Sequence, residues 1–159
     1  MINPLPDLNG KKIFFASDFH LGVPNHDASL EREKRIVKWL DSIKSEAHTI
    51  YLLGDIFDFW FEYKHAIPKG FIRLQGKLAE LRDAGIPISF FTGNHDMWMF
   101  DYFPEELGIP IYRDPQILQV SAGEFLGMDM LEGVVGGNQL AIEQGIEIDG
   151  EIGDTDFRP

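Results

Sequence analysis

Three groups of metal-binding side chains, each directly after an apolar stretch, are the residues of this sequence that could do chemistry. The groups are Asp18-Phe19-His20 after residues 13–17, Gly54-Asp55-Ile56-Phe57-Asp58 after residues 49–53, and Gly93-Asn94-His95-Asp96 after residues 88–92. Carboxylate oxygens, amide oxygens and imidazole nitrogens are ligands of divalent cations such as manganese, iron and zinc. Together the three groups predict most of the site of a hydrolase that uses two metal ions.

The expected secondary structure would bring these groups together. We predict strands at 12–17, 49–53, 88–92 and 109–112, and amphipathic helices at 28–44 and 70–84. Strands that alternate with helices favour a mostly parallel sheet flanked by helices, an α/β fold. Because the carboxyl ends of parallel strands share one edge of a sheet, Asp18, Asp55 and Asn94 would meet there although 37 and 39 positions separate them.

The first two groups supply the predicted ligands of one ion and a bridge to the next. If strand geometry continues past residue 17, Asp18 and His20 point to the same side and can chelate one cation. Asp55 follows the permissive Gly54 and can bridge two cations, whereas Asp58 would orient a ligand rather than bind metal. The alternatives are a carboxylate that caps a loop and an ordinary Gly-Asp turn.

The third group adds a ligand and a candidate catalytic residue. Asn94 could offer its amide oxygen to a metal, and His95 could protonate a leaving oxygen or stabilise charge on a phosphate. Asp96 could fix the tautomer of His95. An Asn-containing turn is the alternative for this group alone. The occurrence of all three groups at strand ends favours a metal site over three unrelated turns.

An aromatic stretch lies beside the predicted crevice. It contains Phe57, Phe59, Trp60, Phe61 and Tyr63. Core packing under the loop is the favoured interpretation. The alternative is that Phe57, Phe59 and Trp60 form an apolar wall for part of a substrate, because so many aromatic side chains in one loop are hard to bury together.

Charge and composition narrow the partners. The formal net charge of −12 argues against non-specific binding to nucleic acid, although bound cations can turn an acidic cleft into an anion site. The 159 residues contain no cysteine, no apolar run long enough for a membrane span and no secretory signal, so we expect a cytoplasmic protein. The oligomeric state is left open.

The sequence changes character near residue 117. We predict a domain at 1–116 and an irregular acidic tail at 117–159, with short strands or disorder as its options. The tail has nine carboxylates against one base, Arg158, and eight of the 16 glycines.

The three groups in this order resemble the calcineurin-like metallophosphoesterases, a family with a mostly parallel sheet in a sandwich. The segments that narrow the resemblance are 17–22 (SDFHLG), 53–64 (LGDIFDFWFEYK) and 91–98 (FTGNHDMW). They resemble the UDP-2,3-diacylglucosamine hydrolases over about residues 8–115. The resemblance implies hydrolysis of the substrate's pyrophosphate to UMP and 2,3-diacylglucosamine 1-phosphate, in lipid A biosynthesis.

The resemblance also implies cofactors and roles. It implies two divalent ions, usually manganese, with Asp18 and His20 on the first, Asp55 as bridge, Asn94 on the second and His95 facing the phosphate. It further implies a nucleotide-lipid substrate and peripheral contact with the inner membrane.

The family pattern continues with a Gly-His element and a Gly-His-x-His element, whereas the last histidine here is His95. We therefore expect weak or no turnover from the 159-residue chain, through truncation, a frameshift or a joined foreign segment. The alternatives are another calcineurin-like phosphoesterase and an inactive, truncated metal-binding fragment.

Overall fold

Four parallel strands form the sheet that carries the predicted site. The computed structural model describes residues 8–114, 116–120, 131–136 and 139–142. The strands are β1 (Lys12–Ala16), β2 (Ala47–Leu53), β3 (Ile88–Phe91) and β4 (Ile111–Tyr112), in the order β1-β2-β3-β4. All three neighbouring pairs are parallel, which confirms the predicted α/β fold.

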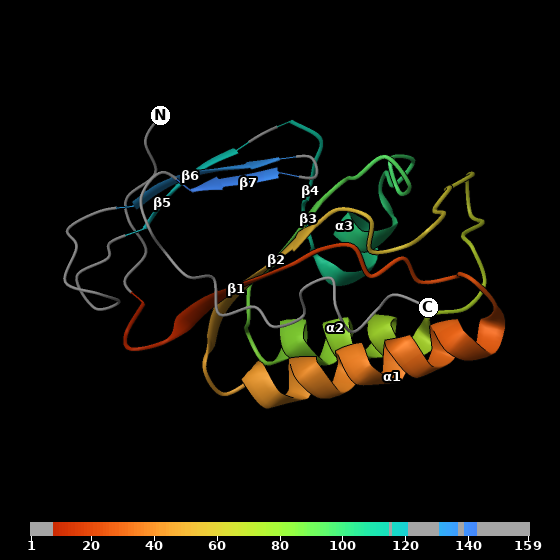
Figure 1. The fold of residues 1–159 in the computed structure, drawn as a ribbon, viewed down its shortest axis with the longest axis horizontal. Coiled ribbons are helices and arrows are strands. Elements are labelled where there is room, and N and C mark those ends of the chain that lie inside the picture. Colours follow the sequence, from red (N-terminus) through yellow and green to blue (C-terminus); the bar gives the residue numbers. More distant parts are fainter. Residues whose placement is uncertain (1–7, 115, 121–130, 137–138, 143–159) are drawn as a thin grey trace.

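Each crossover between neighbouring strands contains a helix. The helices are α1 (His26–Ile43), α2 (Ile72–Asp83) and α3 (Tyr102–Leu107). The longer two, α1 and α2, lie side by side below the sheet (Figure 1). When successive strands are added in one direction across a sheet, right-handed crossovers place the connecting helices on the same face of that sheet. Among the described residues, no helix is both long and apolar enough to cross a membrane.

The helix boundaries differ from the predicted ones for local reasons. The first helix begins two residues early because the Asn25 side chain caps it, accepting a hydrogen bond of 3.0 Å from the Ala28 N–H. The second begins at Ile72, two residues late, because Gly70 and Phe71 have left-handed φ angles of 113° and 56°.

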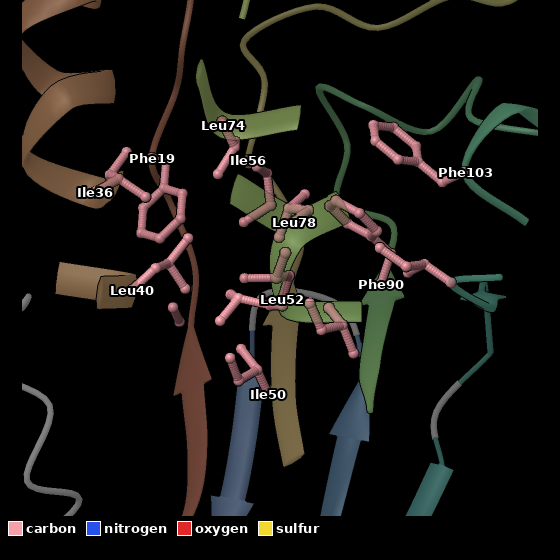
Figure 2. Packing of buried hydrophobic residues seen from close by; sticks show 14 of the residues in the cluster. Phe19, Ile36, Leu40, Ile50, Leu52, Ile56, Leu74, Leu78, Phe90 and Phe103 are labelled. Carbon is pink, nitrogen blue, oxygen red and sulfur yellow. The ribbon is translucent and has the colours of Figure 1, made fainter. Parts of the chain in front are cut away.

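The apolar core fills the space between the sheet and the two long helices. Figure 2 shows Ile36 and Leu40 from α1 and Leu74 and Leu78 from α2 packed around Leu52 of β2. All five are fully or almost fully buried. This core fixes the sheet, and the sheet fixes the loops at its carboxyl edge.

The tail contains more regular structure than we predicted. Its described part forms a separate antiparallel sheet of β5 (Gln116–Val120), β6 (Leu131–Gly136) and β7 (Gln139–Ile142). Irregular structure was the prediction, and short strands were one of its options. The division into a domain at 1–116 and a tail stays a prediction.

Candidate metal centre

The register of the sheet aligns the ends of the three strands that precede the predicted ligands. Ala16 pairs with Leu52, and Leu53 pairs with Phe91. Backbone hydrogen bonds then continue beyond the strands. The Asp18 N–H donates to the Gly54 carbonyl over 3.1 Å, and the His20 N–H donates to the Asp55 carbonyl over 2.8 Å. The first two loops are therefore joined at the sheet edge.

Three candidate ligands have left-handed backbones. The φ angles are 58° at Asp18, 43° at His20 and 52° at Asp55. Such angles are uncommon for residues with side chains, and they persist only where surrounding contacts hold them. The assumption that strand geometry continues through residues 18–20 was wrong, because β1 ends at Ala16. The turned backbone nevertheless places the two side chains near each other.

The side chains of Asp18, His20 and Asp55 can each offer one ligand atom to a common point. Their donor atoms lie within 4.8 Å of one another, and His20 Nε2 is 3.9 Å from Asp18 Oδ1. Asp55 is 2% exposed, whereas the Asp18 side chain is 55% exposed, so the group opens to solvent on the Asp18 side. Two carboxylates and one imidazole suit manganese, iron or zinc. This donor set fits one divalent ion.

Asp58 contacts the rings of both His20 and His95, which lie edge to face with their centroids 4.8 Å apart. Its Oδ1 is 3.4 Å from Nδ1 of each ring. The His95 Nδ1 also lies 3.0 Å from the Asp58 backbone carbonyl. A carbonyl oxygen can only accept, so Nδ1 carries the proton and Nε2 is the nitrogen left for a ligand or substrate. Asp58 thus sits where it can orient both imidazoles, although the ligand atoms of His20, Asp58 and His95 also lie within 4.8 Å of one another. Its role in orienting a ligand stays a prediction.

Asp96 contacts the backbone rather than the ring of His95, which corrects the predicted tautomer role. Its carboxylate is fully buried and accepts backbone N–H hydrogen bonds from both neighbouring loops. The donors are Gly93 at 2.8 Å and Asp55 at 3.3 Å to Oδ1, and Ile56 at 2.9 Å and Phe57 at 3.4 Å to Oδ2. Burial raises the pKa of Asp96, and the backbone donors only partly offset that effect. Asp96 therefore ties the second loop to the third.

Two glycines allow these loops to approach closely. A Cβ atom on Gly93 would overlap Asp55 Oδ1, and one on Gly54 would lie 2.7 Å from the Gly93 nitrogen. The His95 N–H donates to the same Asp55 oxygen over 3.0 Å. Asn94, the remaining predicted ligand, is exposed between Gly93 and His95. The third loop therefore lies directly against the Asp55 carboxylate.

The aromatic stretch alternates between core and surface. Phe57 and Trp60 are fully buried, and both pack against the ring of Phe103, Phe57 stacked on it and Trp60 tilted to it, so neither can line an open wall. This corrects the substrate-wall alternative for these two residues and favours core packing. Phe59 is 57% exposed and Phe61 is 43% exposed.

The exposed rings gather around one residue of the third loop. Trp98, 41% exposed, has its ring centroid 6.2 Å from that of Phe59 and 6.3 Å from that of Phe61. We call Phe59, Phe61 and Trp98 the aromatic ledge. Phe59 follows Asp58 directly and Trp98 stands two positions after Asp96, so the ledge belongs to the same two loops as these carboxylates.

Glu62 holds the base of this ledge, and sequence analysis missed it. The carboxylate is 7% exposed and accepts hydrogen bonds from Trp60 Nε1 at 2.9 Å and from the Asp101 and Tyr102 N–H groups at 2.8 and 3.2 Å. A lone acidic residue within an aromatic run, two positions after a tryptophan whose N–H needs a partner, was the available signal.

This arrangement defines the class of the protein. The sequence profile of the calcineurin-like phosphoesterase family matches residues 11–154, more than half of the chain. The chain belongs to the calcineurin-like phosphoesterases. The matched range runs through the predicted boundary at residue 116.

Individual relatives share one described activity. UDP-2,3-diacylglucosamine hydrolase of Porphyromonas gingivalis is 46% identical over 114 residues, which cover 72% of this chain and 44% of that relative. The protein of the same name from Nitrosococcus oceani is 30% identical over 107 residues, covering 67% and 41%. The one from Proteus mirabilis is 28% identical over 112 residues, covering 70% and 45%. The chain thus spans less than half the length of these curated relatives.

Proposed function

We propose that this chain carries the metal site of a hydrolase that cleaves the pyrophosphate of UDP-2,3-diacylglucosamine. The products would be UMP and 2,3-diacylglucosamine 1-phosphate, an intermediate of lipid A biosynthesis. The observation that carries the proposal is the convergence of Asp18, His20 and Asp55 donor atoms within 4.8 Å. The names of the similar proteins support the choice of substrate.

Two divalent ions, Mn²⁺ in our proposal, are the cofactors. Asp18, His20 and Asp55 would hold the first, and Asp55 together with Asn94 would contribute to the second. When bound, such ions polarise phosphoryl oxygens and lower the pKa of water. The Asp58 carboxylate contacts Nδ1 of His20, so the other ring nitrogen, Nε2, faces Asp18 and would bind the first ion.

His95 is the proposed catalytic residue. Its Nδ1 lies 3.0 Å from the Asp58 carbonyl and 3.4 Å from the Asp58 carboxylate, and these two contacts direct Nε2 away from Asp58. A charged His95 can stabilise the phosphate and donate the Nε2 proton to the oxygen that leaves with the sugar phosphate. The ring is half-exposed, so a bound phosphate can reach it.

The aromatic ledge is the proposed contact for the apolar part of the substrate. Three partly exposed rings offer an apolar surface on the loops that carry the proposed metal centre. Exposed apolar patches often mark a site where another molecule binds. We place the protein in the cytoplasm, in peripheral contact with the inner membrane, where a diacylated substrate resides.

The test compares the 159-residue protein with its Asp55→Asn variant in Mn²⁺. We expect Mn²⁺ binding by calorimetry and slow release of UMP from UDP-2,3-diacylglucosamine, with both lost in the variant. The change removes the bridging charge while keeping the size of the side chain. A Lys34→Gln variant, altered on the exposed surface of α1, is the matched control and should behave as the wild type.

Three other results would contradict the proposal. Turnover of a simple phosphomonoester without UMP release would indicate a different phosphoesterase on the same scaffold. Absence of Mn²⁺ binding would indicate a chain without the proposed metal centre. UMP release that survives the Asp55→Asn change would place the chemistry elsewhere.

A further inference from the structure

The backbone of His20 is held from two sides. Its N–H donates to the Asp55 carbonyl over 2.8 Å, and its carbonyl accepts a hydrogen bond of 2.9 Å from Arg32 Nη1. The φ angle of 43° lies in the left-handed region, which costs free energy unless neighbouring groups fix it. The imidazole can face Asp18 and Asp58 only while this backbone conformation persists.

Arg32 reaches His20 from the buried face of α1. The residue is 8% exposed, and its Nη1 also donates to the Val23 carbonyl over 2.9 Å. One turn earlier, the buried Ser29 hydroxyl accepts a hydrogen bond of 2.8 Å from the Gly22 N–H. Two polar side chains of α1 thus hold the loop at residues 20–23. Arg32 binds its two ends, and Ser29 binds its middle.

From these contacts we infer that Arg32 is a positioning residue for the metal ligand His20. It acts by fixing the His20 carbonyl, and hence the direction of the imidazole, without touching the metal or the substrate. The inference rests on the proposed metal centre and assigns a role to a residue outside the three strand-end groups. Groups that hold metal ligands in place typically change affinity by about 10- to 100-fold when removed.

The charge of Arg32 makes the inference unusually easy to test. The positive charge of the Arg32 guanidinium repels a cation bound nearby. Taken alone, this charge would therefore weaken metal binding. Removal of the side chain should then tighten binding if charge dominates, and weaken it if positioning dominates. The two explanations predict opposite signs for the same substitution.

The experiment measures Mn²⁺ affinity of the 159-residue protein by calorimetry, with thermal unfolding of each sample. We expect Arg32→Met to weaken Mn²⁺ binding about 10- to 100-fold. Arg32→Lys retains the charge but not the guanidinium geometry, so it should recover part of the affinity. This lysine variant also serves if the methionine variant does not fold.

Arg82 supplies the matched control. Its guanidinium likewise donates to backbone carbonyls, those of Ile86, Leu107 and Gly108, but near the amino end of β3, the opposite edge of the sheet. Arg82→Met should lower stability and leave Mn²⁺ affinity within about twofold of wild type, because distant sites act independently.

The outcomes separate the inference from the proposed function. Weaker binding in Arg32→Met and partial recovery in Arg32→Lys would support the inference. Equal or tighter binding in Arg32→Met, or an equal loss in Arg82→Met, would overturn it while leaving the metal centre intact. No Mn²⁺ binding by the wild type would overturn the metal centre and the inference with it.

Discussion

Asp96 and Glu62 are buried carboxylates with similar hydrogen-bonding tasks in two adjoining regions of different character. Asp96 accepts N–H groups from two loops that end in candidate metal ligands, and the region around it is polar and strained. Glu62 accepts hydrogen bonds from the Trp60 side-chain N–H and from the backbone N–H groups at the start of α3, and the region around it is aromatic.

The comparison shows how the same chemical device supports two surfaces. An ionised carboxylate has several lone pairs and no proton of its own. It can therefore accept hydrogen bonds from several N–H groups that have no partner within a strand or helix. At Asp96 this brings together, over the two close-approach glycines, the loops that carry candidate metal ligands. At Glu62 it anchors the buried base, Trp60, from which Phe59 and Phe61 project to the surface.

The largest effect is expected from Asp96→Asn. The amide nitrogen would face backbone donors, so two buried N–H groups lose their acceptor, at a cost of about 3 kcal/mol in the free energy of unfolding. Because these loops carry Asp55 and Asn94, Mn²⁺ affinity should fall at least about tenfold. Urea denaturation and calorimetry measure the two effects. Unchanged metal affinity in a destabilised variant would show that Asp96 does not support the metal centre.

Glu62→Gln is expected to have the second largest effect and to separate the regions. The retained oxygen can still accept from Asp101 and Tyr102, so the cost is smaller, about 2 kcal/mol, and falls on Trp60 Nε1. Mn²⁺ affinity should stay within about twofold of wild type, whereas KM for UDP-2,3-diacylglucosamine rises because the aromatic ledge loses its anchor. A matching loss of metal affinity would contradict the division into two regions.

A carboxylate outside both regions should have the smallest effect. Glu80 is an exposed residue of α2, and hydrogen bonds from Lys44 and Lys77 lower its pKa from 4.5 to about 2. The lowered pKa means that its contribution is complete above pH 4.5 and is lost as the pH falls towards 2. The stability difference between wild type and Glu80→Gln should therefore shrink on acidification and in high salt. If Glu80→Gln lowered the free energy of unfolding as much as Asp96→Asn does, burial of the carboxylate would not determine the order of the three effects.

The sequence predicted the features that rest on local patterns. Buried apolar runs gave the four parallel strands, and the residue types at their ends gave the groups that the structure brings to one edge. Amphipathic periodicity predicted the two long helices, and in α2 the residues Leu74, Leu78 and Leu81 form the buried face. These signals are readable because strand alternation and helix periodicity repeat along the chain.

The supporting contacts could not be read in the same way. Asp96 binds groups about 40 positions earlier, and Arg32 binds carbonyls on a loop that precedes its own helix. Such contacts depend on how loops meet after folding, and a buried carboxylate or guanidinium looks like any surface charge in the sequence. Similarly, Phe57 and Phe59 are alike as residue types, and only the turn of the loop makes one buried and the other exposed.

The central claim is that the loops after two neighbouring strands, β1 and β2, bring Asp18, His20 and Asp55 to one divalent cation. The most direct measurement is an anomalous difference map at the manganese edge from crystals of the 159-residue protein grown in Mn²⁺. The account predicts a peak bonded to the carboxylates of Asp18 and Asp55 and to His20 Nε2. A map without a peak there, or with its main peak among His20, Asp58 and His95 instead, would contradict it.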